Sequence, residues 1–184
     1  MLFRSGSDGV TRCGWCGDDA LYVRYHDTEW GHRLTDPVRL YEKMCLEGFQ
    51  SGLAWITILR KREAFRSAFD GFAPEVVAGY GEADVQRLLG NAGIVRHRGK
   101  IESTINNARR VLELEVGLDE LVDRYRPESH QRPTGTLAAS TPESVALARE
   151  LKRRGFSFVG PTTMYAFMQS VGLVNDHLIG CERV

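Results

Sequence analysis

The sequence has no excess of either charge, few cysteines and no long apolar run. Lysine and arginine together number 24, as do aspartate and glutamate, so any affinity for nucleic acid must come from local basic patches. No apolar segment approaches the ~20 residues of a membrane-spanning helix, and the N-terminus lacks a signal-peptide core. We therefore expect a cytoplasmic protein with no membrane association. In the reducing cytoplasm, four cysteines indicate metal ligands or buried small residues rather than disulfides.

The sequence also lacks any convincing strand-length alternation of apolar and polar residues, which predicts an all-α fold of about eight short helices. Residues 1–11 are polar and rich in glycine and serine, and we expect a flexible N-terminal extension before a single domain over residues 12–184. Asp36-Pro37 and Thr141-Pro142 each place an N-cap residue before a proline, a typical helix start. Helices are expected from residue 36 to residue 48 or 52, and near residues 55–71, 82–89, 101–112, 118–125, 142–155 and 162–171.

Two pairs of potential metal ligands lie at opposite ends of the chain. Cys13 and His26 are spaced C-x12-H, and His177 and Cys181 are spaced H-x3-C; two thiolates with two imidazoles form a closed tetrahedral zinc site. The i, i+4 spacing predicts that His177 and Cys181 share one face of a helical turn, so that a structural zinc joins the two ends. Two alternatives remain: Cys16 forms a C-x2-C pair with Cys13 and leaves His26 free, or these residues bind no metal.

Several large aromatic residues lie near one carboxylate, Glu47, at the end of the first expected helix. The aromatic residues are Trp15, Tyr22, Tyr25, Trp30 and Trp55. An aromatic cage with one acid suits a flat cationic ligand, such as an N3-methylated adenine, through stacking and cation–π attraction. The alternatives are ordinary core packing for the aromatic residues and a solvated helix end for Glu47.

Three short basic runs are candidates for contacts with DNA phosphates, at residues 60–62, 96–100 and 152–154. The third run precedes a turn that ends at Gly160 and joins two expected helices. Backbone N–H groups at Gly160 and Thr162 could hold a phosphate, as in a helix-hairpin-helix motif. Arg96, Arg98 and Lys100 would offer a second contact. Equally, each run could be a solvated helix face.

Several segments, in this order, resemble the 3-methyladenine DNA glycosylase I family of the helix-hairpin-helix glycosylase superfamily. They are Cys13-Gly14-Trp15, Tyr25-His26-Asp27-Thr28-Glu29-Trp30-Gly31, Leu46-Glu47-Gly48, Ile94-Val95-Arg96-His97-Arg98-Gly99-Lys100-Ile101, Phe158-Val159-Gly160 and Val174-Asn175-Asp176-His177. The resemblance covers nearly everything from Arg12 to Cys181. It implies an all-α monomer with one structural zinc that hydrolyses the N-glycosidic bond of 3-methyladenine in double-stranded alkylated DNA and releases the free base.

The resemblance also implies roles for individual residues. It implies zinc ligands at Cys13, His26, His177 and Cys181, and a base pocket of Glu47, Tyr25 and Trp55 surrounded by Trp15, Tyr22 and Trp30. Cys16 stands where the family requires no cysteine. The family is thought to do without the catalytic aspartate of its superfamily, which gives Asp176 little weight in catalysis.

The start of the last expected helix bears on strand cleavage. Superfamily members that also cut the strand carry a lysine there, whereas this chain has Pro161-Thr162-Thr163, so we expect no Schiff base at this place and no lyase activity. Two other classes compete with a glycosylase: a non-catalytic module that senses lesions, and a metal-dependent hydrolase. Release of free base from methylated DNA separates the first from an enzyme, and activity that survives a change of metal would count against the second.

Overall fold

Nine α-helices form most of residues 2–183, the part of the chain that the computed structural model describes. They are α1 (Ala20–Thr28), α2 (Pro37–Gln50), α3 (Trp55–Ala68), α4 (Pro74–Val77), α5 (Glu82–Gly90), α6 (Arg98–Leu112), α7 (Leu118–Asp123), α8 (Pro142–Arg153) and α9 (Pro161–Ser170). Two 3₁₀ helices add single turns, η1 (Gly14–Cys16) and η2 (Asp70–Phe72). The predicted helical fold is confirmed in its main elements. None of the described helices has the length and apolar character needed to cross a bilayer.

The N-terminal segment differs from the flexible extension that we expected. Strands β1 (Phe3–Ser5) and β2 (Thr11–Cys13) pair antiparallel, with Phe3 opposite Cys13. The backbone N–H of Glu182 donates to the carbonyl of Thr11 at 2.9 Å. The hairpin therefore contacts the C-terminal segment, a long-range pairing for which a short polar sequence gives no local signal.

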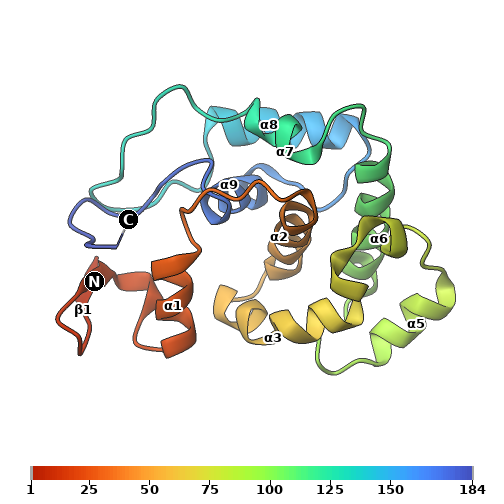
Figure 1. Cartoon of the computed structure of the whole chain (residues 1–184), viewed down its shortest axis with the longest axis horizontal. Helices are drawn as coiled ribbons and strands as arrows, with labels where there is room; N and C mark the ends of the chain where they lie inside the picture. The colour runs from red at the N-terminus through yellow and green to blue at the C-terminus, as the bar shows by residue number, and fades with distance from the viewer. Residues whose placement is uncertain (1, 184) are drawn as a thin grey trace.

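Helix α2 is the central helix, and its sequence explains its start. The side chain of Asp36 accepts a hydrogen bond from the N–H of Arg39 at 2.8 Å, and Pro37 occupies the first helical position, as the sequence predicts. All residues from Leu40 to Phe49 are buried, because helices pack around α2 on several sides (Figure 1). Polar residues on α2 are therefore enclosed and must have specific partners.

The two ends of the chain lie on the same side of the molecule (Figure 1). The N-terminal hairpin and α1 lie there beside the last segment of the chain, which follows α9. This arrangement brings together residues from the first 30 and the last 10 positions of the sequence.

Candidate active site and candidate metal centre

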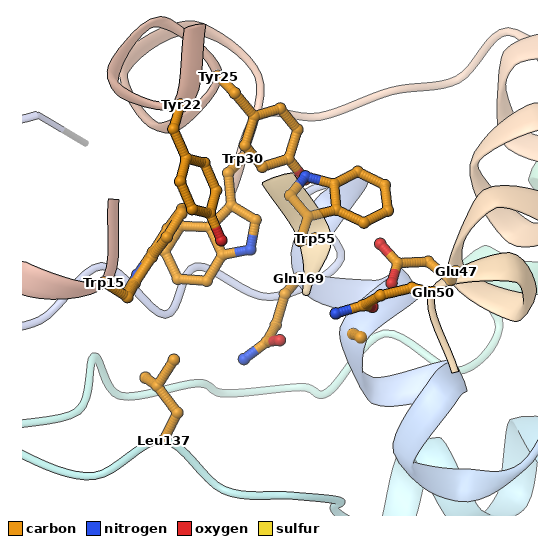
Figure 2. Close-up of a pocket in the computed structure, with 10 residues that line it drawn as sticks. Trp15, Tyr22, Tyr25, Trp30, Glu47, Gln50, Trp55, Leu137 and Gln169 are labelled. Atoms are coloured by element: carbon orange, nitrogen blue, oxygen red, sulfur yellow. The ribbon is translucent and has the colours of Figure 1, made fainter. Parts of the chain in front are cut away.

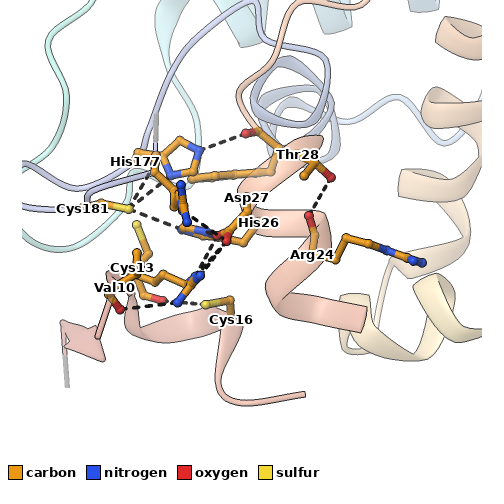
Figure 3. Close-up of polar contacts among 12 residues, drawn as sticks. Val10, Cys13, Cys16, Arg24, His26, Asp27, Thr28, His177 and Cys181 are labelled. Atoms are coloured by element: carbon orange, nitrogen blue, oxygen red, sulfur yellow. Dashed lines mark hydrogen bonds and ion pairs between the residues drawn. The ribbon is translucent and has the colours of Figure 1, made fainter. Parts of the chain in front are cut away.

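Four residues from the two chain ends form a compact, buried cluster of metal-ligand type. Cys13, His26, His177 and Cys181 each present one ligand atom, and these atoms lie within 4.8 Å of one another. The Sγ atom of Cys181 is 3.6 Å from Nε2 of His26 and 3.6 Å from Nδ1 of His177 (Figure 3). Zinc bonds of about 2.0–2.3 Å give tetrahedron edges of roughly 3.3–3.8 Å, so these two separations fit a tetrahedral zinc.

Each histidine ring is oriented by a hydrogen bond at the ring nitrogen that faces away from the cluster. Nδ1 of His26 lies 2.8 Å from Oδ1 of Asp27, and Nε2 of His177 lies 2.9 Å from the carbonyl oxygen of Trp30. A proton on each outer nitrogen leaves the inner nitrogen as a lone-pair donor, which is the usual arrangement of histidine ligands. Burial lowers the pKa of both imidazoles, that of His177 to about 4, so both are neutral near pH 7 and able to bind a metal.

The positions of Cys13 and Cys16 show which of the two ligand sets predicted from the sequence is brought together. Burial raises the pKa of Cys13 to about 12, so a thiolate at this place needs a neighbouring cation, and the backbone N–H of Leu178 donates to its sulfur at 3.3 Å. Cys16 turns away from the cluster and donates its S–H to the carbonyl of Cys13 at 3.1 Å. The donor set with His26 therefore fits a metal, and the alternative with Cys16 does not.

The predicted helical turn that carries His177 and Cys181 is wrong. The segment after α9 is a loop, in which the N–H of Cys181 donates to the carbonyl of Leu178 at 2.9 Å. Arg132 holds this loop by donating to the carbonyls of His177 and Leu178 at 2.8 and 2.7 Å. A tight turn thus places the two ligands together without helical structure.

Next to the metal-type cluster lies a cavity of about 250 Å³ with aromatic walls (Figure 2). All six predicted pocket residues line it; they are Trp15, Tyr22, Tyr25, Trp30, Glu47 and Trp55. The rings of Tyr25 and Trp55 are 5.5 Å apart between centroids, and those of Trp15 and Trp30 are 4.8 Å apart. The aromatic residues therefore pack against one another and also leave a flat-walled space, which pure core packing would have filled.

Glu47 is the acidic residue of this cavity. Its side chain lies on the last turn of α2 beside Trp55 (Figure 2), and the residue is only 4% exposed, so the alternative of a solvated helix end is wrong. Burial raises the pKa of Glu47 to about 7, while Lys43 and Ser170 act in the opposite direction. The cavity thus presents a carboxyl group whose charge is costly when the cavity is empty and which gains most from a cationic ligand.

Sequence reasoning missed a partly buried ionic group behind the cavity wall. Nζ of Lys43 lies 3.4 Å from Oε2 of Glu29 and 4.6 Å from the ring centroid of Tyr25. Arg62 also binds Glu29, with nitrogen–oxygen distances of 2.6 and 3.0 Å. These three residues connect the end of α1 with α2 and α3, the helices that carry Tyr25, Glu47 and Trp55.

Four further residues line the cavity and had no signal in the sequence. They are Gln50, Leu137, Ala166 and Gln169. Gln169 and Ala166 come from α9, and Leu137 comes from the loop between α7 and α8. Only the tertiary structure brings these segments to the aromatic residues of the N-terminal part.

The predicted DNA-backbone residues have different outcomes. Gly160 caps α9, and Thr162 is exposed on its first turn. Arg96 is exposed, whereas Arg98 forms ion pairs with Glu82 and Glu102. Hence Arg98 offers a charge that neighbouring acids already compensate.

For Lys100 the predicted phosphate contact is wrong. Lys100 is buried, and its Nζ donates to the carbonyls of Phe49 at 2.9 Å and Ser51 at 2.6 Å. These carbonyls belong to the end of α2, where a positive charge is favourable. The ammonium group is therefore used to hold the α2–α3 connection.

Two large apolar residues are exposed in loops that adjoin the cavity helices. Leu53 is 41% exposed and lies between Gln50 and Trp55, which both line the cavity. Phe158 is 41% exposed in the α8–α9 turn, close to Gly48 of α2. The sequence analysis identified neither of these exposed apolar residues.

Comparison with known proteins gives a consistent result. A model of the methyladenine glycosylase family matches residues 15–184. The chain is 50% identical to DNA-3-methyladenine glycosylase 1 of Escherichia coli (strain K12) over 94% of this chain and 96% of that protein. It is 43% identical to DNA-3-methyladenine glycosylase of Haemophilus influenzae (strain ATCC 51907 / DSM 11121 / KW20 / Rd), over 94% and 97% of the two chains.

Solved structures agree with the sequence relatives. A crystal structure of 3-methyladenine DNA glycosylase I superposes with a TM-score of 0.90 at 48% identity, covering 93% of this chain and 98% of the other. A variant of 3-methyladenine DNA glycosylase I in complex with 3-methyladenine superposes with a TM-score of 0.88 at 31% identity, covering 94% and 96%. With the family model and both relatives covering nearly the whole chain, this protein belongs to the methyladenine glycosylase family.

Proposed function

We propose that this enzyme hydrolyses the N-glycosidic bond of 3-methyladenine in alkylated double-stranded DNA and releases the free base. The observation that carries the proposal is a flat aromatic cavity with one enclosed carboxyl group, Glu47. The relatives are named as 3-methyladenine glycosylases and a structural neighbour forms a complex with 3-methyladenine, which supports the same substrate.

The chemistry of the lesion fits this cavity. Methylation at N3 gives the base a positive charge, which weakens its bond to deoxyribose and makes it a good leaving group. Extruding the nucleotide costs a few kcal/mol of unstacking; stacking on the aromatic walls of the cavity, such as Trp55, and attraction to Glu47 offset part of that cost. Water then attacks C1′, and the base leaves with the bonding electrons. Positioning, rather than strong acid catalysis, supplies most of the acceleration.

Contacts with DNA would come from the loops beside the cavity. Leu53 is suited to fill the space that an extruded nucleotide leaves in the stack, as apolar wedges do in other DNA-bending proteins. The N–H groups at Gly160 and Thr162 on the first turn of α9, together with Arg96, would hold phosphates in the manner of a helix-hairpin-helix motif.

We further propose that the enzyme is monofunctional. A strand-cleaving lyase needs an amine that can form a Schiff base with the sugar, and none of the described residues lining the cavity is a lysine. The start of α9, Pro161-Thr162-Thr163, also offers no amine. Borohydride treatment during turnover is expected to trap no covalent protein–DNA adduct, and a trapped adduct would refute this part of the proposal.

One structural zinc per chain completes the proposal, held by Cys13, His26, His177 and Cys181. The ion would supply a cross-link between the two ends of the chain and stabilise the thiolates. Four protein donors around it leave no position for a substrate water, which argues against a metal-dependent hydrolase.

The decisive test is release of base from DNA treated with a methylating agent. The protein is expected to liberate 3-methyladenine, detected by chromatography, with Trp55→Ala as a variant in which release is reduced. A protein that binds methylated DNA tightly but releases no base would instead be a lesion-sensing module.

A further inference from the structure

A buried chain of hydrogen bonds leads from the α7–α8 loop to the base cavity. Its centre is Asp176, which is 2% exposed. The carboxylate accepts hydrogen bonds from the hydroxyl of Tyr165 at 2.7 Å and from Nε2 of Gln169 at 2.6 Å, and Nε2 of His130 lies 2.6 Å from its other oxygen. Asp176 does not itself line the cavity.

The contact with Asp176 determines how the amide of Gln169 is oriented. A carboxylate only accepts hydrogen bonds, so it selects the NH₂ end of the amide and turns the carbonyl oxygen Oε1 in another direction. The backbone of Gln169 is also held, since its carbonyl accepts the N–H of Gly31 at 2.9 Å. Gln169 is 8% exposed, and its side chain reaches into the cavity (Figure 2). The residue therefore offers a fixed acceptor to a bound base.

We infer that Gln169, oriented by Asp176, is a specificity-determining residue that accepts a hydrogen bond from the exocyclic amine of the extruded base. This inference rests on the proposed function. An adenine carries two protons on N6, whereas a guanine carries the acceptor O6 at the corresponding place. Glu47 and Gln169 are two acceptors in one cavity, so one can receive each amine proton of an adenine. A guanine-type base would meet two acceptors with its own lone pairs and lose both hydrogen bonds.

The three residues around Asp176 give this arrangement its rigidity. Tyr165 and Gln169 lie on one face of α9, four residues apart, and His130 ties the α7–α8 loop, which also carries Leu137 of the cavity wall. Asp176 is thus a positioning residue, and it acts on the substrate through Gln169.

The test compares two bases in one variant. Gln169→Met keeps the length of the side chain and removes its acceptor. Affinities for free 3-methyladenine and 3-methylguanine are measured by quenching of tryptophan fluorescence. The variant is expected to bind 3-methyladenine about tenfold more weakly, the scale of one buried hydrogen bond, and to bind 3-methylguanine no more weakly than the parent. The preference for adenine therefore falls about tenfold.

A matched control is Gln86→Met. The amide of Gln86 also donates to a carboxylate, that of Glu82, but Gln86 lies on α5 and does not line the cavity. Gln86→Met is therefore expected to prefer 3-methyladenine over 3-methylguanine as strongly as the parent does. Asp176→Asn, which frees the Gln169 amide to turn, is expected to reduce the preference as well, with zinc content measured to monitor the neighbouring ligand His177.

If Gln169→Met weakens the binding of both bases equally, the side chain contributes only packing and the inference is overturned. The inference is also overturned if the substitution changes neither affinity. If the parent protein releases 3-methyladenine from DNA but Gln169→Met has the same ratio of affinities for the two bases as the parent, only this inference fails. If the parent neither binds nor releases 3-methyladenine, the proposed function itself fails.

Discussion

At the scale of single residues, Glu47 illustrates a conflict between stability and function. The residue is enclosed on α2, and burial raises its pKa to about 7. Ionising this carboxyl in the empty cavity is therefore costly, while a cationic base would repay that cost through charge attraction and a hydrogen bond. A residue kept for binding at the expense of folding is expected at a functional site.

Glu47→Gln is expected to weaken binding of free 3-methyladenine by roughly ten- to a hundredfold, since the substitution keeps the shape and replaces a charged acceptor of the exocyclic amine with a neutral amide. Calorimetry at pH 8 measures the effect. An unchanged affinity would show that Glu47 is not the acidic recognition group.

The same substitution is expected to make the protein more stable than the parent, by a margin that grows as the pH rises. Below the ordinary carboxyl pKa of 4.5, Glu47 is protonated in both folded and unfolded chains; above pH 7 the folded chain must ionise it in a buried site. The folded parent thus loses stability across this window relative to Glu47→Gln, by roughly 1–3 kcal/mol. Urea unfolding of both proteins at pH 5 and pH 8 measures this change, and a constant difference between them would contradict it.

At the scale of elements, local sequence signals predicted most helices but not their partners. The caps at Asp36 and Thr141 are present as expected, and the side chain of Thr141 accepts the N–H of Ser144. Helix α1 was missed, although Asp19 caps it, because its residues do not repeat with a clear apolar period. The aromatic residues and Glu47 could be predicted as a pocket, yet Gln169 could not, since it reaches the cavity only through tertiary packing.

The basic run at residues 96–100 shows how a charge pattern can mislead, and it yields a prediction. Arg96 is exposed, whereas Lys100 binds the carbonyls of Phe49 and Ser51. We expect Lys100→Met to lower the free energy of unfolding by about 1–3 kcal/mol, because the carbonyls lose a charged donor.

We expect Arg96→Ala to leave stability nearly unchanged and to reduce the salt dependence of DNA affinity by about one phosphate contact. Urea unfolding and DNA titrations at several salt concentrations check both, and the reverse assignment of the two effects would contradict this interpretation.

At the scale of the whole molecule, the chain ends meet beside the base cavity. Trp15 and Trp30 line the cavity, and both rings lie close to histidines of the candidate metal centre: Trp15 is 5.2 Å from His26 and Trp30 is 4.8 Å from His177 between ring centroids. The carbonyl of Trp30 also contacts His177 at 2.9 Å. The cluster that would hold the proposed zinc is therefore in direct contact with two walls of the pocket.

His26→Ala is the variant that tests this connection. A zinc that joins residues 13 and 26 to residues 177 and 181 closes a loop of most of the chain, and a cross-link of that length contributes about 4–5 kcal/mol in the chain-entropy model. For a protein of this size each kcal/mol corresponds to about 2–4 °C in Tm. We expect His26→Ala to bind less than one zinc per chain and to melt roughly 10–15 °C below the parent, with weaker binding of 3-methyladenine because the tryptophans lose their support.

Cys16→Ser is the matched control, since the thiol of Cys16 points to the carbonyl of Cys13 rather than into the cluster, and it should keep one zinc and a Tm close to that of the parent. Elemental analysis and thermal unfolding measure both quantities. Full zinc content in His26→Ala together with its loss in Cys16→Ser would mean that the ligand set contains Cys16 in place of His26.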